Sequence, residues 1–160
     1  MKILITGAHG QLAQTIMHST QALEHELFFT ARTVESNPAS DSRYQIGRLD
    51  ITDADAVLKA VSDNKIDVII NCAGYTNVAK AEIEKAAAFK ANAEAVTNLA
   101  NAAKSNNALL VHISTDYVYD GEAETPYKET DMANPLNEYG RSKLAGDEIV
   151  LNSGCRCLIF

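Results

Sequence analysis

The sequence predicts an α/β fold in which helices cover a doubly wound parallel sheet. Short apolar stretches alternate with segments of helical periodicity along the whole chain. The central stretches, for example Val68–Asn71, show no polar alternation, which is typical of parallel strands buried on both faces. The first strand also passes into the first helix through a glycine turn. Together these observations call for a parallel sheet between two helical layers.

The first strand is expected over Lys2–Thr6, where β-favouring residues stop at a glycine. The helix behind it is predicted from Leu12, Ile16 and Leu23, which recur at helical spacing. Leu27–Thr30 is expected to be the second strand.

A loop is expected over residues 32–43, which are polar and contain a proline and several serines. A short third strand follows at Tyr44–Leu49. Thr52 is predicted to cap the N-terminus of a helix over Ala54–Ser62. The fourth strand is Val68–Asn71, which is apolar almost throughout.

The second half of the chain continues the alternation. Lys80–Lys104 is rich in Ala, Glu and Lys and predicts one long helix or two abutting helices. A fifth strand is expected over Leu109–Ser114, a further helix over Glu138–Leu151, and a sixth strand over Arg156–Phe160.

Composition and charge exclude several classes of function. Fourteen Lys and Arg against 21 Asp and Glu give a net charge of −7, which disfavours nucleic acid or an anionic membrane as partner. No apolar run approaches the roughly 20 residues that cross a bilayer, and a secretory signal pattern is missing from the first residues. Three cysteines suit a reducing compartment, so a cytoplasmic location is expected. The histidines share no ligand spacing, and no metal site is predicted.

The turn after the first strand has the form Gly-X-X-Gly-X-X-Ala, from Gly7 through Gly10 to Ala13. Glycines there let the backbone approach a pyrophosphate, and free N–H groups at the helix start face its negative charge. Two glycines can also serve only to turn the chain. Their position at the first strand–helix junction favours a dinucleotide site of the Rossmann type.

The second strand ends in Thr30, Ala31 and Arg32, where an acid usually binds the ribose 2′-hydroxyl of NAD. A 2′-phosphate would meet a cation there, so the sequence favours NADPH, with NADH as the alternative. Arg32 can also be an ordinary solvated loop residue. Asp50, at the end of the third strand, is expected to accept a hydrogen bond from the adenine amino group.

Tyr139 and Lys143 lie one helical turn apart and therefore on one face. A neighbouring ammonium stabilises a phenolate, so such a tyrosine can donate a proton to a developing alkoxide. This helix follows the fifth strand, which brings the pair to the sheet edge where Ser114, Thr115 and Asp116 also emerge. A hydroxyl there can polarise a substrate carbonyl.

Other polar and aromatic side chains are expected to have structural roles. Glu82 and Glu84, with Lys80 and Lys85, are predicted to form a solvated helix face. Tyr127 is expected to pack at the base of a loop.

Six longer segments carry a more specific pattern: ILITGAHGQLAQ, DVIINCAGYTNVAKAE, NAEAVTNLANAAK, LLVHISTDYVYDG, PYKETD and NPLNEYGRSKLAGDE. In combination they resemble the dTDP-4-dehydrorhamnose reductase family of extended short-chain dehydrogenases. The resemblance runs from Lys2 to Phe160. Ala13 stands where the family usually has a third glycine, and Ala79 stands where it has an aspartate.

The resemblance implies an N-terminal Rossmann domain over residues 1–160, truncated within its sixth strand before a smaller C-terminal substrate lobe. It implies hydride transfer from NADPH or NADH to the C4 carbonyl of dTDP-4-dehydro-6-deoxy-L-mannose, which gives dTDP-L-rhamnose. A nucleotide sugar is thus the expected small-molecule partner, and the truncated chain is expected to be inactive alone. Mg2+ is implied by the resemblance only and is assigned to no residue.

The resemblance also implies roles for individual residues. Tyr139 would donate the proton, Lys143 would stabilise its phenolate and hold the nicotinamide ribose, and Thr115 would orient the carbonyl. Thr115 and Asp116 would bind the sugar. The residues expected to bind the cofactor are Gly7, Gly10, Gln11, Leu12, Arg32, Asp50, Ile51, Gly74, Tyr75, Thr76 and Lys143.

Two other functions stay open. A non-catalytic NADP-binding regulatory subunit, similar to that of methionine adenosyltransferase, would keep the fold without the reaction. A nucleotide-sugar epimerase or dehydratase would differ in its product. Whether the protein forms a homo-oligomer is also left open.

Overall fold

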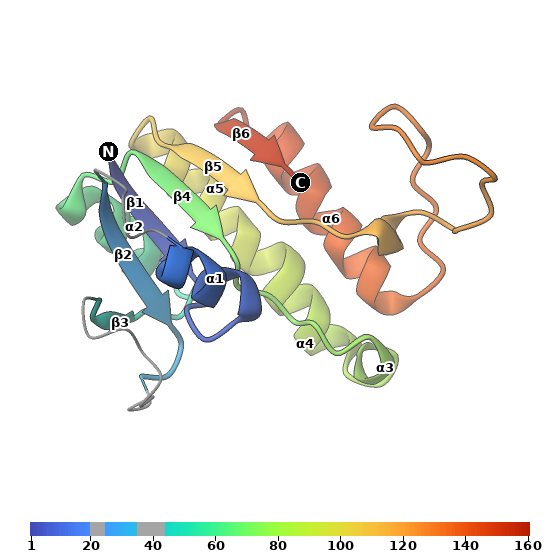
Figure 1. Cartoon of the computed structure of the whole chain (residues 1–160), viewed down its shortest axis with the longest axis horizontal. Coiled ribbons are helices and arrows are strands. Elements are labelled where there is room, and N and C mark those ends of the chain that lie inside the picture. Colours follow the sequence, from blue (N-terminus) through green and yellow to red (C-terminus); the bar gives the residue numbers. More distant parts are fainter. Residues whose placement is uncertain (20–24, 35–43) are drawn as a thin grey trace.

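The computed structural model describes residues 1–19, 25–34 and 44–160. In this part of the chain six parallel strands form one sheet in the order β3-β2-β1-β4-β5-β6 (Figure 1). The strands are β1 Lys2–Thr6, β2 Glu26–Ala31, β3 Ile46–Arg48, β4 Val68–Asn71, β5 Leu109–His112 and β6 Arg156–Ile159. The predicted doubly wound parallel sheet is confirmed.

The strand order puts the beginning of the chain at the centre of the sheet. From β1 the chain moves outward through β2 to β3, returns to β4 on the other side of β1, and continues to β5 and β6. Thr6, the last residue of β1, therefore pairs with Thr30 on one side and with Asn71 on the other. In open α/β sheets, ligands bind beyond the carboxyl ends of the strands where the winding reverses.

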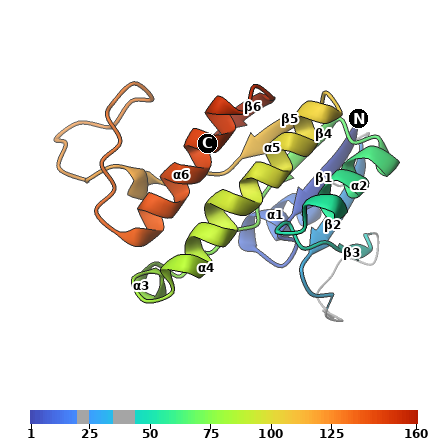
Figure 2. The same ribbon diagram turned by 180° about the vertical axis from the view of Figure 1, so that it is seen from behind.

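Helices connect the strands and cover both faces. They are α1 Gln11–Ser19, α2 Ala54–Asn64, α3 Val78–Ala81, α4 Lys85–Phe89, α5 Ala95–Ser105 and α6 Glu138–Asn152, with a π-helical turn η1 Lys90–Glu94 and a 3-10 turn η2 Asp116–Val118. Figures 1 and 2 show α1 on one face of the sheet and α2, α5 and α6 on the other. Since α4, η1 and α5 follow one another without a break, the predicted long helix begins at Lys85, and α3 is a separate turn.

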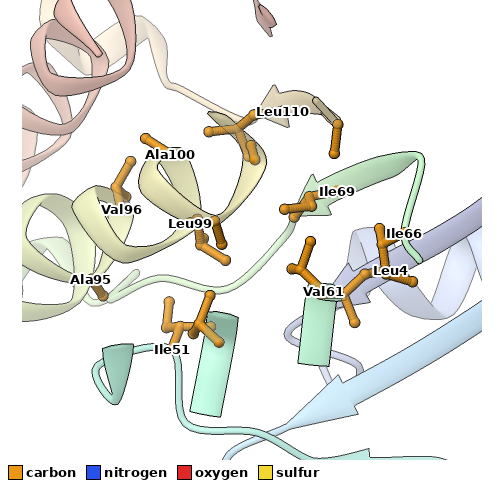
Figure 3. Packing of buried hydrophobic residues seen from close by; sticks show 14 of the residues in the cluster. Leu4, Ile51, Val61, Ile66, Ile69, Ala95, Val96, Leu99, Ala100 and Leu110 are labelled. Carbon is orange, nitrogen blue, oxygen red and sulfur yellow. The ribbon is translucent and has the colours of Figure 1, made fainter. Parts of the chain in front are cut away.

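An apolar layer fills each interface between the sheet and its helices. Figure 3 shows Leu4, Ile69 and Leu110, from three neighbouring strands, in the larger layer. Val61 of α2 and Leu99 of α5 cover them, and both are fully buried. On the opposite face α1 packs against β1 and β2. Burying a side chain of this size stabilises the fold by roughly 1.5–3 kcal/mol, so the strand ends that carry the polar residues are held firmly.

The cap of α2 differs from the prediction, because Asp53 and not Thr52 caps the helix. The carboxylate of Asp53 accepts the N–H of Ala56 at 3.0 Å. Thr52 donates its hydroxyl and its N–H to Asp50 Oδ1, at 2.8 and 2.9 Å. The hydroxyl that could have capped the helix is thus bound to a nearer acceptor.

Four strands also differ in their bounds. The second, Glu26–Ala31, is one residue longer at each end than predicted, and the sixth ends at Ile159. The third strand is shorter than Tyr44–Leu49, and the fifth ends at His112, before Ser114. The prediction for Leu23 and most of the loop expected over residues 32–43 lie outside the described residues. Within the described ranges, no helix is long and apolar enough to cross a membrane.

Candidate active site

A cleft of about 620 Å³ opens at the carboxyl edge of the sheet, where the loops after β1, β2, β3 and β4 meet. It occupies the crevice that a reversal of winding creates. Gln11 and Leu12 are exposed in the first turn of α1, beside this lining but outside it. Eight of the residues predicted to bind a cofactor line the cleft: Gly7, Gly10, Arg32, Asp50, Ile51, Gly74, Tyr75 and Thr76.

The glycine turn is pressed against the end of β4. Gly7 has a φ of +69°, and a Cβ there would lie 2.7 Å from the carbonyl oxygen of Cys72. The N–H of Gly10 donates to the carbonyl of Gly7 at 2.8 Å, and α1 begins at the next residue. Ala13 is fully buried between α1 and the sheet. The turn therefore needs glycine for its close approach, and the start of α1 offers N–H groups to an anion.

Charged groups line the cleft beyond β2 and β3. Arg32 is exposed directly after β2. His9 Nε2 lies 2.9 Å from the carbonyl oxygen of Thr33, which ties the glycine turn to the same loop. The two hydrogen bonds from Thr52 lower the pKa of the Asp50 carboxyl, and the charge of Arg32 lowers it further. An ionised carboxylate and a guanidinium thus share this wall.

Asn92 joins the wall of the cleft to α6, a role that sequence reasoning missed. Its Oδ1 accepts the N–H of Tyr75 at 2.7 Å, and its Nδ2 donates to the carbonyl of Tyr75 and to Ser142 Oγ, both at 3.0 Å. A Cβ at Gly74 would lie 2.8 Å from Asn92 Oδ1. Asn92 is 1% exposed and lies in the π-helical turn η1, a feature frequent at functional sites. The signal in the sequence was an asparagine within an alanine-rich helical stretch.

The predicted solvated face around the start of α4 is exposed and also makes specific contacts. Tyr75 donates its hydroxyl to Glu84 Oε2 at 2.7 Å, which raises the pKa of Tyr75 to about 12. Glu82 Oε1 accepts the N–H of Glu138, the first residue of α6, at 2.8 Å. Lys85 pairs with the carboxylate of the same Glu138 at 3.2 Å. The side chains of Glu82, Glu84 and Lys85 are exposed, as the prediction of a solvated face required, and they also connect the loop after β4 to α6.

Tyr139 and Thr115 both contact the short turn η2. The ring of Tyr139 meets the ring of Tyr117 edge to face, with centroids 5.7 Å apart. Thr115 Oγ1 accepts the N–H of Tyr117 at 3.3 Å and donates to Asp116 Oδ1 at 3.2 Å. Asp116 and Tyr117 also line a second hollow of about 360 Å³. Thr115, Asp116 and the ring of Tyr139 are therefore all found at the turn η2, at one corner of the molecule.

Lys143 is buried beneath that corner. It is 6% exposed, and its ammonium donates a hydrogen bond to the carbonyl oxygen of Ile113. Burial lowers the pKa of this ammonium, and the charge of Asp147 opposes that shift. Lys143 thus lies at the junction of β5 and α6 with Thr115 and Tyr139, and none of the three lines the larger cleft.

Comparison with known proteins relates the whole chain to one family. The family model described as the RmlD substrate binding domain matches residues 1–160. A dTDP-4-dehydrorhamnose reductase of Burkholderia thailandensis is 40% identical over 160 residues, which are 100% of this chain and 49% of that protein.

Solved structures agree with this relation. A dTDP-4-dehydrorhamnose reductase of Clostridium acetobutylicum matches with a TM-score of 0.85 and 40% identity, over 99% of this chain and 52% of that one. The enzyme of that name from Bacillus anthracis, solved in complex with NADP, matches with a TM-score of 0.79 and 34% identity, over 99% and 51%. The chain spans about half the length of the relatives that it matches. It belongs to the dTDP-4-dehydrorhamnose reductase family, the family of the RmlD substrate binding domain.

Proposed function

We propose that the protein reduces the C4 carbonyl of dTDP-4-dehydro-6-deoxy-L-mannose with NADPH, giving dTDP-L-rhamnose and NADP+. The observation that carries this proposal is the cleft at the carboxyl edge of the sheet, where the strand order reverses. The Gly7 turn lies in its wall. The loop after β4, also in its wall, is joined to α6 through the hydrogen bond between Asn92 and Ser142. Family membership supports the reaction class. Because the chain spans about half the length of its relatives, we also propose that turnover needs a substrate lobe beyond residues 1–160.

The cleft would hold the dinucleotide. The exposed start of α1 would bind the pyrophosphate, Asp50 and Ile51 would border the adenine, and Arg32 would pair with the 2′-phosphate of NADPH. Gly74, Tyr75 and Thr76 would line the middle of the cofactor. When bound, the cofactor supplies the hydride.

The corner formed by β5 and α6 would supply the proton. Tyr139 would donate the phenolic proton to the carbonyl oxygen as it becomes an alkoxide, and Lys143 would stabilise the phenolate left behind. Thr115 would donate a hydrogen bond to the same oxygen, and Asp116 would bind the sugar hydroxyls. One hydride and one proton convert the ketone to the alcohol.

The described residues offer no ligand set for Mg2+. The part of the chain that the structure describes has no group of three or more His, Cys, Asp and Glu side chains able to hold a metal ion. No step of the proposed reaction is therefore assigned to a metal.

Two measurements test the proposal. Fluorescence titration of the 160-residue chain with NADPH and NADH measures the cofactor site, with tighter binding of NADPH expected; equal affinities would contradict the role of Arg32. Assay of the complete protein with the 4-keto sugar tests the reaction, and failure to oxidise NADPH would overturn the reductase assignment. Binding without turnover would favour the regulatory subunit, and analysis of the sugar product separates a reductase from an epimerase or dehydratase.

A further inference from the structure

A row of buried polar side chains runs beneath the strand ends, from β1 to α6. It begins at Thr6, which donates its hydroxyl to Asn71 Oδ1 at 2.7 Å. The N–H of Ala73 donates to the same oxygen at 3.2 Å. With two donors on Oδ1, the amide orientation of Asn71 is determined, and its Nδ2 points toward β5.

The amide of Asn71 determines the tautomer of His112. Asn71 Nδ2 is a donor and lies 3.1 Å from His112 Nδ1, so Nδ1 must be the acceptor. A neutral imidazole then carries its proton on Nε2. His112 is fully buried, and burial together with the charge of Lys143 lowers the pKa of His112 to about 3. The ring is therefore neutral near pH 7 and presents an Nε2–H to α6.

Asp147 of α6 faces that N–H. Its Oδ1 lies 3.4 Å from His112 Nε2, and among the described residues neither atom has a hydrogen-bond partner. Its Oδ2 accepts the hydroxyl of Ser114. Asp147 is 7% exposed, and a buried carboxylate of this kind needs an explanation in the function or the packing of the site.

Asp147 is also one helical turn beyond Lys143 on α6. Two charged groups that neighbouring elements bring to α6 have other partners. Lys85 of α4 pairs with Glu138, and Glu82 accepts the N–H of that residue. His112 of β5 is neutral, as argued above. Asp147 is therefore the buried carboxylate one turn along α6 from Lys143, and its charge raises the pKa of the ammonium against the effect of burial. Asp116 of η2 and Glu148 of α6 are exposed.

We infer that Asp147 is a positioning residue for Lys143: hydrogen-bonded to Ser114 and facing His112, it holds the end of β5 against α6 and provides the counter-charge that keeps the buried ammonium protonated. The inference rests on the proposed function only for the use of that ammonium. Lys143 donates to the carbonyl of Ile113, and Ser114 is the next residue. The hydrogen bond from Ser114 to Asp147 therefore orients both the carboxylate and the backbone that carries the acceptor of Lys143. A lysine buried without a counter-charge loses its proton at lower pH.

The test is the titration of Lys143 in the 160-residue chain, followed by NMR of the Nζ of 13C,15N-labelled lysine. Lys143→Met identifies the signal. Asp147→Asn is expected to lower the titration midpoint by about one pH unit or more. Asp147→Glu, which keeps the negative charge, should restore most of the midpoint that Asp147→Asn lowers. The exposed control Glu148→Gln should leave the midpoint of Lys143 unchanged. A midpoint in Asp147→Asn equal to that of the unsubstituted chain would overturn the inference.

A second measurement needs no substitution, should Asp147→Asn fail to fold. In the unsubstituted chain the Nζ signal of Lys143 should shift when Asp147 is protonated in acid. The pH midpoint of that shift should equal the midpoint measured from the carboxyl carbon signal of Asp147. An Nζ signal that ignores this titration would contradict the inference. Neither measurement uses cofactor or substrate, so an inactive complete protein would refute the proposed function and leave this result standing.

The complete protein adds a kinetic readout. A lower pKa of Lys143 moves the loss of kcat on the alkaline side to lower pH, whereas a residue that only supported packing would reduce kcat at every pH. Asp147→Asn is expected to move the alkaline limb of the kcat–pH profile to lower pH and to leave the KM for the sugar substrate unchanged. Asp147→Glu is expected to return the limb to its original pH. An unmoved limb would show that Asp147 does not act through Lys143.

Discussion

A Cβ on Gly140 would lie 2.2 Å from the carbonyl oxygen of Tyr117, closer than any side chain allows. The first turn of α6 thus rests directly on the turn η2. This contact brings Tyr139, the residue before the glycine, to the ring of Tyr117 and to the turn that Thr115 caps. The corner proposed to protonate the substrate depends on a residue that has no side chain.

Gly140→Ala is expected to destabilise the chain by about 1–3 kcal/mol, because a new methyl group must push α6 away from η2. Urea unfolding followed by circular dichroism measures the change. Gly47→Ala is the matched control, since a Cβ there meets its nearest atoms at 3.6 Å, an ordinary contact distance. Equal stability of the two variants would contradict the close contact of α6 with η2.

Arg32→Ala is expected to weaken binding of NADPH about tenfold or more and to change binding of NADH little. A charge-assisted hydrogen bond to a phosphate contributes about 1.5–3 kcal/mol, and only NADPH carries the 2′-phosphate. Fluorescence titration of both cofactors measures the ratio. Arg156→Ala, exposed on the far edge of the sheet, should leave both affinities unchanged. Parallel losses for the two cofactors in Arg32→Ala would exclude the proposed pairing.

Tyr139→Phe in the complete protein is expected to lower kcat by about 100-fold or more while cofactor binding is retained, because a general acid typically contributes a factor of this size. Steady-state kinetics and cofactor titration give the two numbers. Tyr119→Phe is the control, since that hydroxyl donates to the carbonyl of Lys128 within its own loop. A Tyr139→Phe enzyme with normal kcat would remove the phenol from the mechanism.

The free energy of unfolding is expected to fall as the pH drops from about 6.5 to about 5. His112 has a pKa lowered to about 3 in the folded chain, whereas an unfolded histidine titrates near 6.5. In this window the unfolded state binds a proton that the folded state does not, so stability falls by up to about 1.4 kcal/mol per pH unit. His112→Gln should flatten the slope measured by urea unfolding, and His18→Gln, exposed on α1, should not.

Asp53→Ala is expected to cost about 1 kcal/mol of stability through loss of the cap on α2. Thr52→Ala should cost less, because the hydroxyl of Thr52 bonds to Asp50 and not to the helix. It should instead raise the pKa of the Asp50 carboxyl, which NMR titration measures. A larger loss of stability for Thr52→Ala than for Asp53→Ala would reverse the assignment of the cap.

The strands and the cleft were predictable because their signals are local. An apolar run without alternation, such as Val68–Asn71, is typical of a buried parallel strand wherever it occurs. Gly7 precedes the first helix at the strand–helix junction where dinucleotide-binding turns carry a glycine. The cap of α2 was not predictable in this way, because Thr52 and Asp53 are both good caps and the choice depends on where the carboxylate of Asp50 lies.

By itself the sequence determined the alternation of strands and helices, the parallel sheet and the edge at which the cleft opens, because residue type and spacing encode them directly. Only the tertiary structure decided which polar side chains meet. Asn71 and His112 are 41 residues apart, and the hydrogen bond between them exists because β4 and β5 are paired in register. Asp147 reaches the same histidine only because α6 packs against the sheet, so its link to Lys143 follows from packing that no local pattern records.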